Sequence, residues 1–153
     1  MTIHVAIPLF PKFTALDGIG PYEVLQRVPE VKITFVGHEL GPVRSDTGQL
    51  GIEIDATFAD VPAPDVIVFP GGPGTRQLLE DEQVLDWVRT AHATTTFTTS
   101  VCTGSLVLAA AGLLDGLTAT THWGARDILT RYGATPVADR VVDVTGFASQ
   151  VAQ

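Results

Sequence analysis

A chain of 153 residues that is 45% hydrophobic and 17% charged can bury a core and is too apolar to be disordered, so one domain over residues 1–153 is expected. A net charge of −8 argues against nucleic acid as a partner, because binding nucleic acid needs a basic surface. The single cysteine excludes an internal disulfide and a cysteine-based zinc site, and it fits a reducing cytoplasm.

The first half of the chain alternates apolar strands with a helix and polar turns. Residues Ile3–Phe10 form a continuous apolar run with no basic residue before it, which predicts a buried first strand and not a signal peptide. Leu16 to Pro21 reads as a loop because it holds two glycines and a proline. The elements predicted around and after it are a helix over Tyr22–Val28, a strand over Val31–Gly37, a hairpin within His38–Ile54 and a strand over Asp65–Phe69.

The second half continues the same alternation. It predicts helices over Leu78–Ala93, Ser105–Leu114 and Gly124–Tyr132, and extended segments over Thr96–Val101, Leu117–Thr121 and Val137–Val144. The apolar part of the uncharged stretch between Ala91 and Leu114 is far shorter than the ~20 residues that span a membrane, so no membrane association is expected. Apolar strands alternating with helices predict an α/β sandwich around a mostly parallel sheet.

The cysteine lies at the junction between the Thr96–Val101 strand and the next helix. Cys102-Thr103-Gly104 leaves few residues for the turn, and Gly104 lets the helix start close to the strand. A thiol at such an elbow points out of the carboxyl edge of the sheet, where the amino end of a helix favours the thiolate. We therefore expect Cys102 to be a nucleophile with a lowered pKa. The alternative is a small buried hydrophobic residue, as lone cysteines often are.

Other candidate site residues follow the first and third predicted strands, at the same edge of the sheet. Asp17 lies in an apolar, glycine-rich loop, where burial would raise its pKa and let it carry a proton. Alternatively, Asp17 caps the helical segment that begins near Ile19. Gly71 and Gly72 would let backbone N–H groups approach a ligand, as an oxyanion hole requires, unless the connection needs glycine only for its turn.

The histidines give a weaker signal. His122 follows a threonine-rich strand and either lines the site or is structural. The other three, His4, His38 and His92, lie far apart without the spacing of metal ligands, so no metal is expected. Gly71-Gly72-Pro73-Gly74 fits neither the dinucleotide fingerprint nor the P-loop, so no nucleotide cofactor is expected.

Taken together, these residues resemble the PfpI-like superfamily, which is similar in fold to the class I glutamine amidotransferases. The matching pieces occur in the family's order over nearly the whole chain. They are Leu16-Asp17-x-x-Gly20-Pro21, Phe69-Pro70-Gly71-Gly72, Ser100-Val101-Cys102-Thr103-Gly104-Ser105 and Ala119-Thr120-Thr121-His122-Trp123. The resemblance implies one PfpI-like domain, a flavodoxin-like three-layer sandwich with a mostly parallel sheet and a cysteine nucleophile elbow.

Within the superfamily, Asp17 with Cys102-Thr103-Gly104 resembles the isonitrile hydratases. These lyases add water to an isocyanide, a small-molecule substrate, and give an N-substituted formamide. The resemblance implies that Cys102 attacks the isocyanide carbon, that Asp17 protonates it, and that Thr103 orients the intermediate. Gly71, Gly72 and His122 would contact the substrate. The proteases and amidotransferases of the superfamily tend to have a histidine at the position of Thr103, so the general base for amide cleavage is absent here.

A second group shares the Asp and Cys-Thr-Gly pattern, namely the amino-terminal sensor domains of AraC-type transcription regulators. A non-catalytic ligand- or redox-sensing domain is therefore the alternative, although no basic helix-turn-helix region follows in this sequence. Family members usually continue past a Thr-x-Gly-Gly turn into a long final helix. Here Val144-Thr145-Gly146 is followed by Phe147-Ala148-Ser149-Gln150, so we expect that helix to be missing or altered. The resemblance and the short chain predict a homodimer.

Overall fold

A seven-stranded sheet forms the centre of the computed structural model, which describes residues 1–144 and 149–152. The strand order is β10-β11-β7-β6-β1-β2-β5, and among these strands all neighbours pair in parallel except β10 and β11. The predicted α/β fold with a mostly parallel sheet is thereby confirmed. The strands are β1 (Ile3–Pro8), β2 (Val31–Gly37), β5 (Ala56–Thr57), β6 (Val66–Phe69), β7 (Phe97–Val101), β10 (Val141–Val144) and β11 (Ser149–Ala152).

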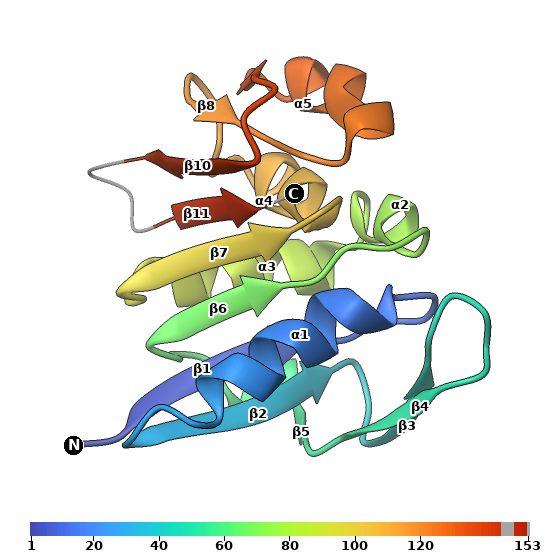
Figure 1. The fold of residues 1–153 in the computed structure, drawn as a ribbon, viewed down its shortest axis with the longest axis vertical. Coiled ribbons are helices and arrows are strands. Elements are labelled where there is room, and N and C mark those ends of the chain that lie inside the picture. Colours follow the sequence, from blue (N-terminus) through green and yellow to red (C-terminus); the bar gives the residue numbers. More distant parts are fainter. Residues whose placement is uncertain (145–148, 153) are drawn as a thin grey trace.

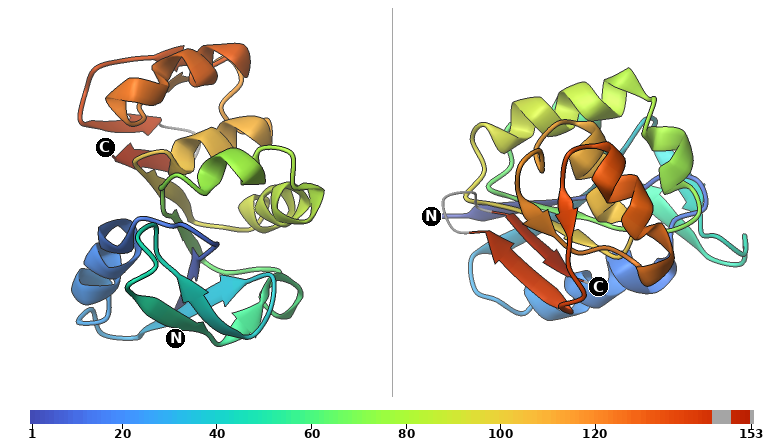
Figure 2. Two further views of the ribbon diagram at one scale, coloured as in Figure 1. Left: turned by 90° about the vertical axis from the view of Figure 1, so that its right-hand side faces the viewer. Right: turned by 90° about the horizontal axis from the view of Figure 1, so that it is seen from above.

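Helices on both faces of the sheet complete three layers (Figures 1 and 2). One face carries α1 (Ala15–Leu25), and the opposite face carries α2 (Thr75–Leu78), α3 (Glu82–His92) and α4 (Gly104–Ala110). The remaining elements connect the strands of the sheet and its helices. They are the hairpin β3 (Gly41–Arg44)–β4 (Gly51–Ile54), the 3₁₀ turns η1 (Phe58–Asp60) and η2 (Trp123–Ala125), α5 (Arg126–Arg131) and the pair β8 (Thr118–Ala119)–β9 (Thr135–Pro136).

The core follows from the apolar strands and from the amphipathic pattern of α3. Central strands are apolar on both faces because helices cover both, as the burial of Ile7, Ile67 and Phe69 shows. The inward face of α3 is also buried, and the indole N–H of Trp87 donates to the carbonyl of Val61 at 2.8 Å. This bond satisfies the polar atom that burying a tryptophan would otherwise leave without a partner.

The helix α1 begins seven residues before the predicted Tyr22, so the expectation that Asp17 lies in a loop is wrong. Two glycines and Pro21 suggested a loop, but packing against the sheet outweighs the low helix propensity of these residues. Gly18 faces the end of β1, where a Cβ atom would lie 3.3 Å from Leu9. Glycine at position 18 therefore allows α1 to approach the sheet closely. Asp17 lies in the first turn of α1.

Other elements also begin or end at residues different from the predicted ones, for local reasons. The helix predicted over Leu78–Ala93 begins only at Glu82, as α3, because the carboxylate of Asp81 accepts from the N–H of Val84 at 3.3 Å and caps the helix there; the short α2 ends at Leu78. The β8 strand pairs only with β9 among the described strands and lies outside the central sheet. The α4 helix ends at Ala110, close to Gly112, whose φ is +89°. The predicted β3–β4 hairpin and the Gly133 stop after α5 are confirmed.

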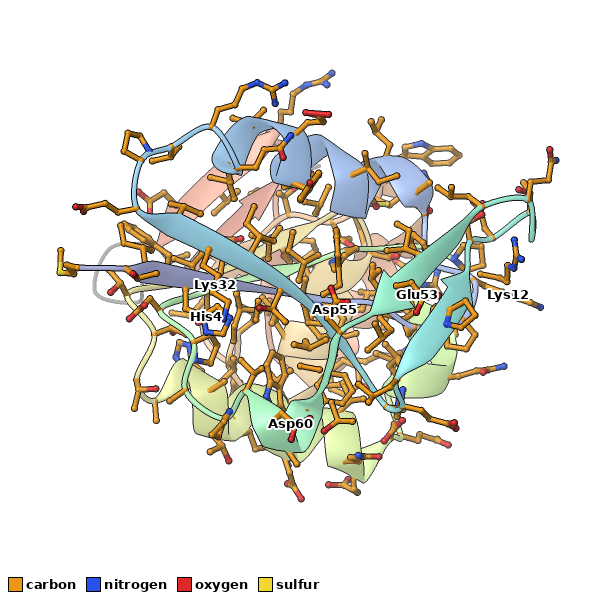
Figure 3. The ribbon with its side chains drawn as sticks, turned by 90° about the horizontal axis from the view of Figure 1, so that it is seen from below. His4, Lys12, Lys32, Glu53, Asp55 and Asp60 are labelled. Carbon is orange, nitrogen blue, oxygen red and sulfur yellow. The ribbon has the colours of Figure 1, made fainter. Side chains whose placement is uncertain are left out.

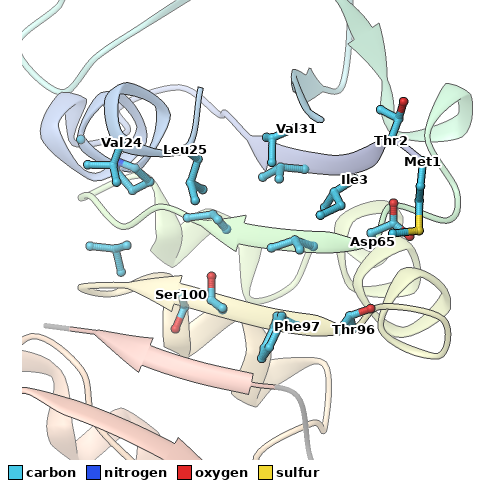
Figure 4. A pocket seen from close by; sticks show the side chains of 17 residues that line it. Met1, Thr2, Ile3, Val24, Leu25, Val31, Asp65, Thr96, Phe97 and Ser100 are labelled. Atoms are coloured by element: carbon cyan, nitrogen blue, oxygen red, sulfur yellow. The ribbon is translucent and has the colours of Figure 1, made fainter. Parts of the chain in front are cut away.

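On the face of the sheet that carries α1, the helix covers only part of the strands. A groove of about 850 Å³ remains beside it and exposes mostly apolar side chains of β1, β6 and β7 (Figure 4). Val24 and Leu25 of α1 form one wall, and Phe97 at the start of β7 is 46% exposed. Residues 145–148, where the sequence departs from the family pattern, lie outside the described residues.

Within residues 1–144 and 149–152, no helix is long and apolar enough to cross a lipid bilayer.

Candidate active site

The turn between β7 and α4 holds Cys102 in a strained backbone conformation. Its φ of +55° lies in the left-handed region, which residues other than glycine rarely adopt. The α4 helix begins only two residues later, at Gly104. Glycine allows this short connection, because a Cβ at Gly104 would overlap the carbonyl oxygen of Phe69. A non-glycine residue held at positive φ on a strand-to-helix turn has the form of a nucleophile elbow.

Asp17 is brought to this turn by the first turn of α1 and is 8% exposed. One carboxylate oxygen accepts from the N–H of Gly71 at 3.2 Å, and the carboxyl group is also hydrogen-bonded to the Cys102 thiol. The carboxyl ends of β1, β6 and β7 therefore place an acid, a thiol and a glycine loop together, as the sequence predicted.

The pKa of each partner in this pair is raised. Burial raises the pKa of the Asp17 carboxyl, and the hydrogen bonds from Gly71 and Cys102 oppose that effect. Burial also raises the pKa of the Cys102 thiol, and the Asp17 charge raises it further, against the opposing hydrogen bonds from Thr103. The expectation of a lowered thiol pKa is therefore wrong. At neutral pH this arrangement favours a thiol that donates to the Asp17 carboxylate.

The two loop glycines are engaged with the protein and not turned toward solvent. Gly71 donates to Asp17, whereas Gly72 donates to the hydroxyl of Thr103 at 2.9 Å. A Cβ on Gly71 would lie 2.9 Å from the Cβ of Cys102, and Gly72 has a φ of +133°. Glycine is therefore needed at both positions, by the close approach to Cys102 and by the positive φ. An oxyanion role for these N–H groups would require them to exchange their present acceptors.

Thr103 is the centre of a buried hydroxyl network. Its hydroxyl accepts from Gly72 and donates back to the Gly72 carbonyl at 3.2 Å. The fully buried Thr75 donates to that carbonyl at 2.8 Å and contacts the Thr103 hydroxyl at 3.2 Å. Thr103 thus fixes the glycine loop against the Cys102 turn. Thr75 was not predicted, because a threonine at the start of a short helix carries no distinguishing sequence signal.

His122 reaches the same edge of the sheet from the segment after β8. Its charge lowers the pKa of Asp17, and its Nδ1 accepts from the N–H of Gly124 at 3.2 Å. The ring stacks at a tilt on Trp123, with 5.1 Å between the centroids, and Trp123 is 72% exposed. The histidine is therefore close enough to act on Asp17 electrostatically, while its ring caps the η2 turn.

The remaining histidines each make a local structural bond. His4, beside its register partner Lys32 (Figure 3), bonds to Thr34 at 2.8 Å. His38 bonds to Asp81 at 2.7 Å, and His92 bonds to Thr98 at 2.7 Å. Among the described residues, no group of three or more histidine, cysteine or acidic side chains is arranged to hold a metal ion.

Two hydroxyls that were not predicted contact the backbone of Cys102. Ser105 and Thr121 both donate to the Cys102 carbonyl, at 3.3 and 3.2 Å. Thr121 is part of the motif Ala119-Thr120-Thr121-His122-Trp123, and nothing in its sequence context shows which atom it contacts.

Known proteins share this arrangement of strands and helices. The model of the DJ-1/PfpI family matches residues 3–148. An isonitrile hydratase of Pseudomonas putida is 51% identical over 142 residues, which is 93% of this chain and 62% of that protein. A ThiJ/PfpI family protein of Pseudomonas syringae superimposes with a TM-score of 0.92 at 36% identity, over 99% of this chain and 62% of the other. The deglycase PfpI of Pyrococcus furiosus is 26% identical over 137 residues, 88% of this chain and 81% of that protein.

The fold and the cysteine elbow thus define a flavodoxin-like α/β protein with a candidate catalytic thiol. The chain belongs to the DJ-1/PfpI family. It spans less than two thirds of the length of the isonitrile hydratase and of the Pseudomonas syringae protein.

Proposed function

We propose that this protein is a cysteine-dependent isonitrile hydratase, which converts R–N≡C and water into the formamide R–NH–CHO. The hydrogen-bonded pair of Asp17 and Cys102 at the strained turn is the observation that carries the proposal. The identity of 51% to an isonitrile hydratase supports it, because the two deglycases among the relatives are only 26% and 27% identical.

The first half of the reaction needs a nucleophile and a movable proton. As the Cys102 sulfur attacks the terminal carbon of the isonitrile, its proton passes to the Asp17 carboxylate. Attack leaves an electron pair on that carbon, and Asp17 then delivers the proton there. The product is a thioimidate, Cys102–S–CH=N–R, and Asp17 is again a carboxylate. A carboxyl group with a raised pKa suits both the uptake and the release of this proton.

The second half uses the same carboxylate as a base. Asp17 takes a proton from water while the water oxygen bonds to the thioimidate carbon, and this proton then goes to the nitrogen. The carbon–sulfur bond breaks as the new hydroxyl loses its proton, and that proton returns to sulfur. The products are the formamide and the free thiol. Thr103 orients the intermediate through its hold on Gly72, and Gly71, Gly72 and His122 border the reacting carbon.

The chemistry at the position after Cys102 also supports hydration over amide cleavage. Thr103 is buried and its hydroxyl is held by Gly72 and Thr75. Amide cleavage needs a base that takes the proton of the thiol and then gives a proton to the leaving amine, and a hydroxyl so engaged is unsuited to either step.

Mass spectrometry and product analysis test this function directly. We expect the protein, incubated with an alkyl isonitrile, to release the matching formamide and to show a transient Cys102 adduct heavier by the mass of the isonitrile. The variant Cys102→Ala serves as the control and should give neither signal. Isonitrile binding by the wild-type protein with no formamide would instead support the ligand-sensing alternative.

Assembly and compartment complete the proposal. We propose that the protein acts as a homodimer, and light scattering at micromolar concentration should give twice the chain mass of 16.2 kDa. A monomer mass under these conditions would contradict this. The cytoplasm is the proposed compartment, because the reaction needs the free Cys102 thiol and a reducing environment protects it.

A further inference from the structure

The carbonyl of Cys102 lies just outside the helix that follows it. The N–H of Leu106 bonds to the Thr103 carbonyl at 3.0 Å, so the backbone ladder of α4 starts one residue after Cys102. Among residues 1–144 and 149–152, no backbone N–H donates to the Cys102 carbonyl. Two side-chain hydroxyls, those of Ser105 and Thr121, donate to it instead. A partly buried carbonyl without such partners would be costly, so these hydroxyls belong to the architecture of the turn.

The two donors differ in where they come from. Ser105 lies in the first turn of α4, so its bond is local to the turn. Thr121 is 19 residues further along, in the segment that links β8 to η2, and it is fully buried. Of these two bonds, the one from Thr121 connects the Cys102 turn to the segment that carries His122.

The backbone strain at Cys102 explains why the hydrogen bond from Thr121 would matter. A positive φ in a residue with a side chain persists only where the surroundings hold it, and relaxing the peptide plane would swing the Cα–Cβ bond. The thiol would then leave its hydrogen bond with Asp17. We propose that Thr121 is a positioning residue, whose hydroxyl holds the Cys102 carbonyl and so keeps the sulfur in line with Asp17. This inference rests on the proposed function, since it concerns the same nucleophile.

The variant Thr121→Val tests the proposal because it keeps the shape and removes the hydroxyl. We expect kcat for isonitrile hydration to fall about tenfold, or ~1.4 kcal/mol in the barrier, with KM within about twofold of wild type. Thr121→Ser should restore most of the rate. The pH midpoint of Cys102 alkylation by iodoacetamide should move down toward that of an ordinary thiol, because a displaced sulfur no longer faces the Asp17 charge.

Thr120→Val is the matched control. Thr120 is adjacent and equally buried, and its hydroxyl has no partner among the described residues. We expect wild-type kcat and an unchanged alkylation midpoint for this variant. A loss as large as that of Thr121→Val would overturn the proposal, since any buried threonine would then have the same effect.

The outcomes separate the two levels of the argument. Wild-type kcat and midpoint in Thr121→Val would disprove the positioning role. Should valine prevent folding, as circular dichroism would show, Thr121→Ala and Thr121→Ser carry the same comparison. If the wild-type protein hydrates no isonitrile, the proposed function fails, while the iodoacetamide profile still decides whether Thr121 positions the thiol.

Discussion

At the scale of single residues, Asp17 has two opposite effects on Cys102. It opposes ionisation of the thiol at rest, and it assists the thiol as a nucleophile during the reaction. Its charge and the burial of the site keep the thiol protonated, so the nucleophile is not ionised at rest. The same carboxylate is the base that can take the thiol proton when a substrate arrives. The hydrogen-bonded pair therefore stores a proton that the isonitrile carbon later needs.

The variant Asp17→Asn separates these two roles. Replacing the carboxylate with an amide removes a negative charge beside the thiol, so the pKa of Cys102 should fall and its alkylation by iodoacetamide at pH 7 should speed up. Turnover of isonitrile should nevertheless drop by ~10²-fold or more, because an amide cannot carry the proton. Stopped-flow alkylation and formamide release measure the two effects on one preparation.

Asp46→Asn is the control for charge alone. The Asp46 carboxylate raises the pKa of Asp17 from a distance, and it is exposed in the turn of the β3–β4 hairpin. Its removal should cost far less turnover than Asp17→Asn does. Slower alkylation in Asp17→Asn, or normal turnover, would show that Asp17 does not couple to the thiol in this way.

Burying Asp17 should also have a cost that depends on pH. Its folded-state pKa is raised above the ordinary value of 3.8, so the carboxyl favours the folded state when protonated and opposes it when ionised. Above that raised pKa, Asp17→Asn should therefore unfold at a higher temperature than wild type. As pH falls through the folded pKa toward 3.8, the difference should shrink. Calorimetry at pH 7 and pH 4 measures it, and a constant difference would contradict this linkage.

The sequence could predict Cys102, Asp17 and the glycine loop because each sits at the end of a recognisable strand. It could not predict Thr75 or the bonds of Thr121, because hydroxyls contributed by distant segments leave no pattern along the chain. The direction of the Cys102 pKa was wrong for a related reason. The helix end was visible in sequence, whereas the burial and the Asp17 charge that outweigh it exist only after folding.

At the scale of elements, the contact between α4 and the end of β6 determines where the nucleophile sits. Gly104 begins α4 directly against the backbone of Phe69 and Pro70. Helix propensity alone would favour alanine there by ~1 kcal/mol, but a Cβ would overlap main-chain atoms that cannot rotate away. Packing therefore outweighs propensity at this position.

We expect Gly104→Ala to lower stability by several kcal/mol, since backbone must shift to admit the Cβ. The reverse change near the other end of the same helix, Ala110→Gly, should cost only about 1 kcal/mol. Propensity alone predicts opposite signs for the two changes, whereas the packing argument predicts two losses, the larger at Gly104. Urea denaturation of both variants decides, and a stabilised Gly104→Ala protein would refute the packing argument.

The boundaries of strands could be predicted from the sequence more closely than the start of α1. The strand Val31–Gly37 was predicted to the residue, because an apolar run between turn residues has few other interpretations. The start of α1 was missed because Gly18, Gly20 and Pro21 have low helix propensity, and the close packing that Gly18 allows exists only after folding.

At the scale of the whole molecule, the two faces of the sheet are covered unequally. Three helices, α2, α3 and α4, pack on one face, whereas α1 leaves a groove of about 850 Å³ over β6 and β7 on the other (Figures 2 and 4). The family resemblance implies a final helix that packs on the sheet, and this sequence departs from the family pattern after Val144. We propose that this groove is the surface on which a helix of that kind would pack.

An amphipathic helix fused to the carboxyl end through a glycine–serine linker tests this. Seated in the groove, it would remove Val24 and Phe97 from water, and full burial of each such side chain contributes about 1.5–3 kcal/mol. A protein of this size gains about 2–4 °C in melting temperature per kcal/mol, so a rise of several degrees is expected. The same fusion with its apolar positions changed to serine should give none. Equal melting temperatures for the two fusions, in a protein that light scattering shows to be monomeric, would mean that the groove does not take a helix.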